Sequence, residues 1–183
     1  MNDLSAIQRL KNGDIGGLEE LVARYQVKAV RTAFLILHDE ALAEDTVQET
    51  FVRLYRHIGQ FDGTRPFEPY LLRSVANAAL NVARKTERQV SLDDDAKPLE
   101  KLLTQAVSVE SEVEYRQLKQ EIVQVLSRLK PRERAVIIQR YYLGMSEKEM
   151  AATLDAPRGT IKWLLNAART ELRKRFASER SEE

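Results

Sequence analysis

Apolar residues fall at helical spacing along almost the whole of this 183-residue chain. Residues that interrupt helices are rare, since the chain has seven glycines and five prolines. An apolar residue at every third or fourth position gives a helix one hydrophobic face, and several such helices must bury those faces on one another. The sequence therefore predicts an all-α fold.

Two of the predicted helices are separated by a short break between Met145 and Phe176. Ser146 is placed to cap the first helix, and Glu149 can reach back to the cap amide, which is the capping-box pattern. The break at residues 155–159 contains a proline, which lacks an amide hydrogen, and Gly159, which tolerates positive φ. Thr160 is then placed to cap the second helix.

The second helix of this pair has two different faces. Its apolar face is formed by Ile161, Leu164, Leu165, Ala168, Leu172 and Phe176. The opposite face is polar and mostly cationic, with Lys162, Asn166, Arg169 and Arg173. A tight helical pair of this kind is typical of a helix-turn-helix that inserts its second helix into the DNA major groove. An ordinary helical hairpin with a solvated basic face remains the alternative.

The remaining predicted helices cover both halves of the chain, at residues 17–37, 42–58, 70–88, 117–129 and 131–143. Pro131 can open the last of them at its first position, and Gly144 ends it. We expect its core face to be formed by Val136, Ile137, Tyr141 and Leu143.

Charge divides the chain into three parts. Residues 1–90 have no net charge, residues 91–117 have three basic and seven acidic residues, and residues 118–183 have fourteen basic and nine acidic residues. This pattern predicts two small helical domains joined by a flexible acidic linker. We expect a first domain at 1–90, the linker at 91–116, a second domain at 117–178 and a tail at 179–183.

The composition bears on the kind of chemistry that the chain can perform. It has no cysteine and two histidines, which fit no metal-binding pattern. No apolar run reaches the length of a membrane span, and no signal-peptide segment stands at the N-terminus. We therefore expect a cytoplasmic protein without a metal, a cofactor, membrane insertion or enzymatic activity.

An acidic patch is expected near the start of the helix at 42–58. It comprises Glu44, Asp45, Gln48 and Glu49. Acidic side chains stabilise the N-terminus of a helix. From the residues of this helix alone, we favour such stabilisation as the reason for the patch. The alternative is a docking surface for a basic partner.

The following segment, residues 59–69, is an irregular loop that carries Phe61 and Phe67. These rings could hold an unstacked base, or they could equally fold into the core.

The next helix carries a polar stripe that we expect to face outward. It comprises Arg73, Asn77, Asn81, Arg84 and Arg88. Arginine suits phosphates and asparagine suits base edges, so this stripe favours nucleic-acid binding.

Three segments of the chain together resemble the extracytoplasmic-function group of sigma-70 factors of bacterial RNA polymerase. The first, AEDTVQETFVRLYRHIGQF, is similar to the polymerase-binding helix of that family. The second, FEPYLLRSVANAALNVARK, resembles the helix that engages the promoter −10 element. The third is similar to the C-terminal domain of the family and reads LKPRERAVIIQRYYLGMSEKEMAATLDAPRGTIKWLLNAARTEL. The order and separation of the three segments make the resemblance specific.

The resemblance implies a role for each surface in a promoter-specificity subunit. The acidic face would dock on the coiled coil of the polymerase β′ subunit, which reverses the interpretation favoured above. Asn77 would help to capture a flipped −10 base, in a pocket formed with the loop from Phe61 to Phe67. The second domain would contact the β flap and read the −35 element as duplex. The −35 contacts would come from Arg158, Thr160, Lys162, Trp163, Asn166, Arg169 and Arg173. An anti-sigma factor is the usual further partner.

The sequence departs from the family pattern in the helix expected to read DNA. The family commonly continues Gly-Thr-Val-Lys-Ser-Arg, whereas this chain has Ile161, Lys162, Trp163 and Leu164 after Gly159-Thr160. Trp163 could stack on a sugar, contact a thymine methyl group or pack on a neighbouring helix.

Two other functions remain open at this point. A stand-alone helix-turn-helix regulator would bind an operator without polymerase, but it leaves the acidic patch unexplained. A helical protein-binding adaptor would show no salt-dependent DNA binding even with core polymerase present.

Overall fold

The computed structural model describes residues 3–89 and 123–179, and within these ranges the chain forms helices and turns without a strand. This confirms the predicted all-α class. The helices group into two compact units that divide between Val82 and Ala83, inside one long helix. The predicted acidic linker at 91–116 lies outside the described residues. None of the helices in the described ranges is both long and apolar enough to cross a membrane.

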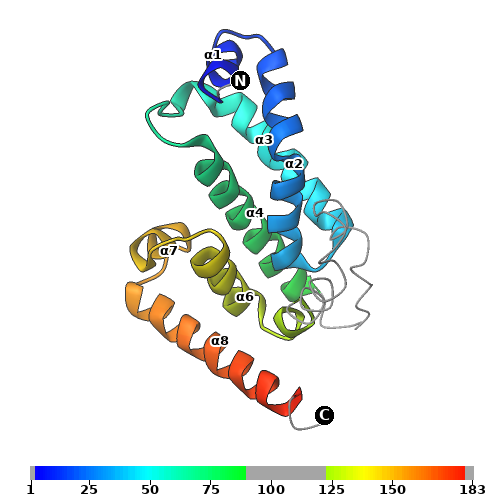
Figure 1. The fold of residues 1–183 in the computed structure, drawn as a ribbon, viewed down its shortest axis with the longest axis vertical. Helices are drawn as coiled ribbons and strands as arrows, with labels where there is room; N and C mark the ends of the chain where they lie inside the picture. The colour runs from blue at the N-terminus through cyan, green and yellow to red at the C-terminus, as the bar shows by residue number, and fades with distance from the viewer. Residues whose placement is uncertain (1–2, 90–122, 180–183) are drawn as a thin grey trace, which may run out of the picture. The chain divides into compact units, whose positions relative to one another are not determined.

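The first unit is built from four α-helices (Figure 1). They are α1 (Asp3–Lys11), α2 (Gly16–Leu37), α3 (Glu40–His57) and α4 (Phe67–Gln89), with a short 3₁₀ turn, η1 (Ile58–Gln60), after α3. α1 and α3 both pack on α2. The start of α4 is joined to α2 by contact between the Tyr25 and Phe67 rings and by the Lys28–Glu68 ion pair.

Local signals set the ends of these helices. Asp14 Oδ1 accepts a hydrogen bond from Gly16 N at 2.9 Å at the start of α2. His38 ends α2 with a left-handed conformation, φ 56°. Asp39 then caps α3, because its side chain accepts from Leu42 N at 2.9 Å. The break between the helices predicted at 17–37 and 42–58 is thus confirmed, and it consists of a C-cap at His38 followed directly by an N-cap at Asp39.

The second unit contains the predicted helical pair. Residues 123–127 are helical, and they are followed by α6 (Pro131–Ile137), the π-helical segment η2 (Ile138–Tyr142), α7 (Glu147–Thr153) and α8 (Arg158–Glu179). α6 and α7 both pack on α8. Pro131 stands in the first turn of α6, as predicted, and Gly144 has φ 64° just beyond η2. The buried apolar residues of this unit include Val125, Leu126, Val136, Met145, Met150, Ile161, Leu165 and Ala168.

The prediction that Tyr141 belongs to the core of this unit is wrong, because its side chain is 61% exposed. The reason is the π-helical segment, in which Leu143 N bonds to Ile138 O across five residues. An inserted residue of this kind turns the helix face by about 100° relative to the α-helical period. Tyr141 therefore leaves the face that Val136 and Ile137 occupy.

Candidate functional site

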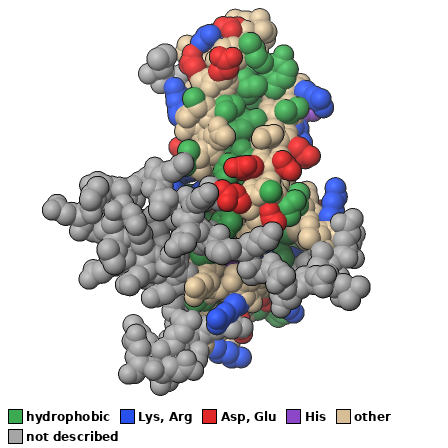
Figure 2. All heavy atoms as spheres, turned by 90° about the vertical axis from the view of Figure 1, so that its right-hand side faces the viewer, with side chains coloured by type: hydrophobic (Ala, Val, Ile, Leu, Met, Phe, Trp, Pro, Cys, Tyr) green, Lys and Arg blue, Asp and Glu red, His purple; other side chains and the backbone are tan. Residues whose placement is uncertain are grey.

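The acidic patch on α3 is a solvent-exposed surface. Glu44, Asp45, Gln48 and Glu49 are all exposed. Figure 2 shows acidic side chains gathered beside apolar ones on one face of the protein. The helix begins at Glu40, so Glu44 is its fifth residue, and the only acidic residue in its first turn is Glu40. The favourable effect of the helix dipole is confined to the terminal turn. Helix stabilisation therefore does not account for this patch.

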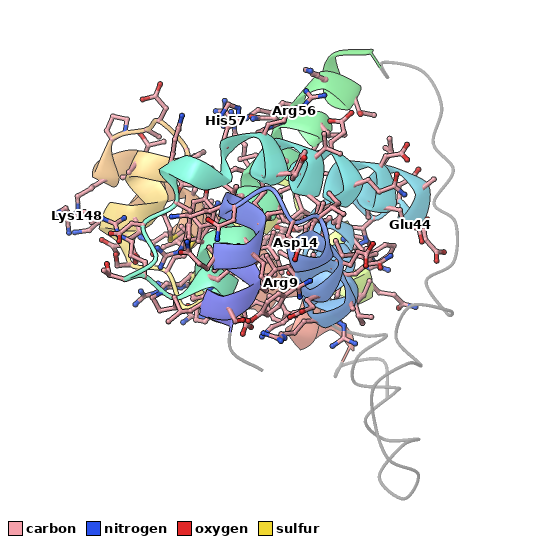
Figure 3. The ribbon with its side chains drawn as sticks, turned by 90° about the horizontal axis from the view of Figure 1, so that it is seen from above. Arg9, Asp14, Glu44, Arg56, His57 and Lys148 are labelled. Atoms are coloured by element: carbon pink, nitrogen blue, oxygen red, sulfur yellow. The ribbon has the colours of Figure 1, made fainter. Side chains whose placement is uncertain are left out.

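The patch continues into two shallow grooves. One runs along α3 and is lined by Asp45, Gln48, Glu49, Val52, Arg53, Arg56 and His57. Figure 3 shows Glu44 toward one end of α3 and Arg56 and His57 toward the other. The second groove lies between α2 and α3 and is lined by Val22, Gln26, Val30, Glu44, Val47, Gln48, Phe51 and Val52. Val52 is 47% exposed beside these carboxylates, so the patch offers an apolar group with charged groups around it.

The two phenylalanines of the loop are buried. Phe61 and Phe67 meet edge to face with ring centroids 5.6 Å apart, and Phe67 also contacts Tyr25 at 5.7 Å. Of the two possibilities that the sequence left open, the rings thus take the one in which they fold into the core. Direct contact of either ring with DNA remains an untested prediction.

An exposed aromatic residue, Tyr70, stands on these buried rings. Its ring centroid lies 4.8 Å from that of Phe61 and 6.5 Å from that of Phe67, and its side chain is 41% exposed. Sequence analysis missed this residue, although its spacing of three from Phe67 puts the two on neighbouring positions of α4. Tyr70 therefore offers ring surface that the phenylalanines do not.

The polar stripe of α4 is less exposed than predicted. Arg73, Asn77 and Arg84 are half-buried, whereas Asn81 is exposed. The Oδ1 atom of Asn77 is buried and accepts no hydrogen bond within the described ranges. Arg88 lies on α4, and its side chain is outside the described residues.

The helical pair of the second unit has the predicted first helix. Ser146 accepts from Glu149 N at 3.3 Å, and its own amide donates to Glu149 Oε2 at 2.8 Å, which confirms the capping box. The turn differs from the prediction at two positions. Positive φ is adopted by Asp155, at 46°, rather than by Gly159. α8 begins at Arg158, so Thr160 lies inside the helix and does not cap it.

The start of α8 is set by Pro157. Its carbonyl accepts from Thr160 N at 2.9 Å and from Ile161 N at 3.2 Å, so the helix starts three residues earlier than a cap at Thr160 predicts. Arg158 lies at this start, 3.9 Å from Glu147 of α7. The first turns of α8 and the turn that precedes it are thus held in place by α7.

The outward face of α8 is cationic and carries one large aromatic side chain. Thr160, Lys162, Trp163, Asn166 and Arg173 are all exposed, and Trp163 is 65% exposed. Trp163 therefore does not take the packed position that the sequence allowed. Leu164 is buried, so the apolar and polar faces divide between Trp163 and Leu164.

Arg169 is engaged by a residue that sequence analysis placed in the core. Its Nε donates to the Tyr141 hydroxyl at 2.8 Å, and its guanidinium carbon lies 5.8 Å from the centre of that ring. Tyr141 comes from η2, so this contact joins the fourth turn of α8 to the helical segment that precedes α7. The π-helical segment that creates the contact has no signal in the sequence.

Groups of histidine, aspartate and glutamate with the arrangement of a metal site do not occur in the parts of the chain that the structure describes.

The comparisons with known proteins agree with the division into two units. The family model described as Sigma-70 region 2 matches residues 21–89, and the model described as Sigma-70, region 4 matches residues 119–172. The ECF RNA polymerase sigma factor SigW of Bacillus subtilis is 29% identical over 176 residues, which cover 93% of this chain and 94% of that protein.

Two further similarities cover most of the chain. The ECF RNA polymerase sigma-E factor of Escherichia coli is 29% identical over 175 residues, which cover 92% of this chain and 91% of that protein. Among solved structures, the sigma factor RpoE in complex with the anti-sigma factor NepR from Bartonella quintana has a TM-score of 0.63 at 21% identity. That match covers 85% of this chain and 94% of the other, and it concerns the fold.

Proposed function

The chain belongs to the extracytoplasmic-function group of the sigma-70 family, promoter-specificity subunits of RNA polymerase, and we propose that its two units engage two elements of one promoter. The first unit binds core polymerase and the −10 element, and the second reads the −35 element. The protein acts by binding alone, in the cytoplasm, and the melted DNA is delivered to the catalytic centre of the polymerase.

Polymerase binding is assigned to the acidic face of α3, with the coiled coil of β′ as the partner. The observation that carries this assignment is the exposure of Asp45, Gln48 and Glu49 beyond the first turn of α3, next to accessible apolar groups. Charge complementarity with a basic partner would raise the association rate and select the partner, and the apolar groups would contribute buried area. The second unit would contact the β flap.

At the −10 element, we assign base capture to the loop at 58–66 and the adjoining part of α4. Tyr70 supplies an exposed ring, and stacking of a base on an aromatic side chain contributes about 1–3 kcal/mol. Asn77, half-buried on the same helix, is the second residue that we assign to the captured base. The buried rings of Phe61 and Phe67 pack against the ring of Tyr70.

At the −35 element, α8 enters the major groove with its N-terminal turns closest to the bases. Lys162, Trp163 and Asn166 project from those turns and are exposed. Arg169 and Arg173 lie farther along the helix, where a recognition helix leaves the base edges and meets phosphates. Their charge contributes affinity that falls with salt, because each neutralised phosphate releases counterions.

An anti-sigma factor is a further proposed partner. The sigma factor RpoE shares this fold and was solved in complex with the anti-sigma factor NepR. Such a regulator would compete with polymerase for the acidic and apolar surface of α2 and α3.

Run-off transcription tests the proposed function. Core polymerase with this protein should start transcription on a subset of a promoter library, and core alone should not. The selected promoters also give the consensus. Footprinting of an operator by the protein alone, with no transcription in any mixture, would favour a stand-alone regulator.

A paired neutralisation tests the docking face. Asp45→Asn with Glu49→Gln should weaken core polymerase binding on the order of tenfold, because two carboxylates of the interface are lost. The matched control is Glu19→Gln with Glu40→Gln, which removes the same charge from exposed positions in the first turns of α2 and α3. The control should bind within about twofold of the unsubstituted protein. Equal losses for both variants would refute the assignment of this face.

A further inference from the structure

The N-terminal helix α1 is an integral part of the first unit, although the matching family model begins only at residue 21. Ala6, Ile7 and Leu10 of α1 are buried. The approach to α2 is so close that a Cβ atom on Gly17 would lie 2.3 Å from the carbonyl oxygen of Ala6. Because only glycine fits there, the position of α1 on α2 is closely determined.

A side-chain network fastens the connection between these helices. Arg9 Nε donates to Asp14 at 2.7 Å, and Arg9 also pairs with Glu20 of α2. Figure 3 shows Arg9 and Asp14 close together beside α1. Asp14 in turn accepts from Gly16 N at the start of α2. The end of α1 is thus fixed relative to the body of the unit.

From this fixed end, α1 reaches the loop between α3 and α4. Lys11 Nζ donates to the carbonyl oxygen of Phe61 at 2.7 Å, across 50 residues of sequence. Leu4 lies beside the loop as well, since its Cδ2 atom would be 3.8 Å from a Cβ atom on Gly63. The loop is therefore held from outside by a helix that was not expected from the sequence.

Inside the loop, the side chain of Asp62 fixes the turn formed by the next residues. Its carboxylate accepts from Thr64 N at 3.0 Å and from Thr64 Oγ1 at 2.7 Å, and Arg65 lies 3.3 Å away. The hydrogen bonds from Thr64 are the main reason why the pKa of Asp62 lies below its usual value, and the charges of Arg65 and Lys11 act in the same direction. Phe61 and Asp62 are adjacent, so Lys11 holds the loop at the start of this turn.

We propose that Lys11 is a positioning residue for the −10 element: through Phe61, α1 holds the loop beside Tyr70 in the conformation that accepts an unstacked base. This inference rests on the proposed function, because it concerns the same −10 site. Lys11 itself does not touch DNA. If the loop is already ordered in the free protein, base capture does not have to supply the entropy cost of ordering it. The hydrogen bond from Lys11 to Phe61 therefore favours promoter opening.

Three variants separate positioning from general stability. Lys11→Met keeps the length and apolar stem of the side chain but removes its charge and its donors. Lys11→Arg keeps a donor and the charge. Gln8→Met is the control on the same helix, because Gln8 is exposed and, within the described residues, its side chain bonds to Asn12 at the end of that helix.

The readouts are thermal unfolding, core polymerase affinity and the yield of open complexes by permanganate reactivity of −10 thymines, on a promoter selected by run-off transcription. With Lys11→Met we expect open complexes to fall about three- to tenfold, the effect of one partly exposed hydrogen bond from a charged donor. Lys11→Arg should retain at least half of the yield, and Gln8→Met should match the unsubstituted protein. Core affinity should be unchanged in all three. Unfolding should be unchanged for Lys11→Arg and Gln8→Met, and Lys11→Met should lose only the modest stability of the one bond it removes. On promoters that are melted in advance, Lys11→Met should also distinguish less well between the normal −10 base and a mutated one.

Normal opening and normal discrimination with Lys11→Met would overturn the inference and leave the proposed function intact. Parallel losses of core affinity, opening and thermal stability would also overturn it, because they would make Lys11 a general structural residue. Failure of the unsubstituted protein to open any promoter with core polymerase would overturn the proposed function, and this inference with it.

Discussion

A buried amide in the second unit leads to a quantitative prediction of stability. Gln139 is fully buried, and neither its Oε1 nor its Nε2 atom has a hydrogen-bond partner in the described ranges. It lies in η2, and its main-chain carbonyl accepts from Met145 N at 2.9 Å, just before the capping box of α7. The side chain therefore carries an unsatisfied polar group next to the segment that positions the helical pair.

The magnitude follows from the cost of that amide. Burial of an unpaired amide costs about 1–3 kcal/mol in protein mutational data. Gln139→Leu removes this cost, and the similar volume of leucine limits the packing penalty to less than about 1.5 kcal/mol. We expect a net stabilisation of roughly 1–2 kcal/mol, which raises the unfolding temperature of a unit of this size by about 4–8 °C per kcal/mol.

Urea unfolding of the full chain measures this effect. The only tryptophan, Trp163, lies on α8 of the same unit, so its fluorescence follows unfolding of that unit. Circular dichroism at helix wavelengths follows both units. The control is Gln124→Leu, at an exposed position of the helix at 123–127, which should change the free energy of unfolding by less than about 0.5 kcal/mol.

The urea midpoint should rise for Gln139→Leu with an unchanged slope, which indicates a change in stability without a change in the surface exposed. A lower midpoint, or one equal to that of the control, would refute the reasoning. It would mean that the amide of Gln139 is satisfied in solution. Gln139→Glu provides the opposite test, since a buried unpaired carboxylate should destabilise this unit by more than the glutamine does.

Two further contacts give predictions of a different kind. Tyr141→Phe removes the hydroxyl that accepts from Arg169 Nε but keeps the ring, so affinity for −35 duplex should fall about two- to fivefold and equally for all −35 sequences, as titrated by fluorescence anisotropy. A loss confined to one base position would instead make Arg169 a base reader. At Asp14, the pKa lies below its ordinary value of 3.8, chiefly because Arg9 donates to the carboxylate. The folded state therefore releases this proton more readily than the unfolded chain. The stabilisation of the fold by the ionised Asp14 is complete above the ordinary pKa of 3.8, and it is lost as the pH falls below that pKa. The difference in unfolding temperature between Asp14→Asn and the unsubstituted protein should accordingly stay constant from about pH 6 to about pH 5 and shrink as the pH falls below about 4.

Local signals in the sequence were sufficient for most helix ends. The capping box at Ser146, the proline at the start of α6 and the end of the second helix at Leu37 each rest on a few adjacent residues, and each is found in the structure. The helical class follows from the spacing of apolar residues, which needs no knowledge of tertiary contacts. These features are predictable because their causes lie within one or two turns of chain.

The features that were missed depend on contacts between distant segments. α1 has only nine residues, and a helix this short owes its stability to packing, here on Gly17 of α2. The sequence could not show which aromatic residues near the loop are buried and which are exposed. The burial of Phe61 and the exposure of Tyr70 depend on how the start of α4 meets α2. The π-helical turn that exposes Tyr141 has no local signature, and it moved a predicted core residue to the surface.

The geometry of α8 also explains how its departure from the family pattern would alter DNA reading. At the two positions after Lys162, where the family resemblance leads one to expect serine and arginine, this chain has an exposed Trp163 and a buried Leu164. One cationic side chain is thus absent from the turns that we propose face the DNA, and Arg169 farther along is already bonded to Tyr141. Fewer phosphate contacts mean a shallower fall of affinity with salt. The exposed indole supplies apolar contact instead, and the apolar group that a major groove presents is the thymine methyl. The proposed reading of the −35 element by this protein therefore depends more on apolar contact, and less on charge, than the family pattern implies.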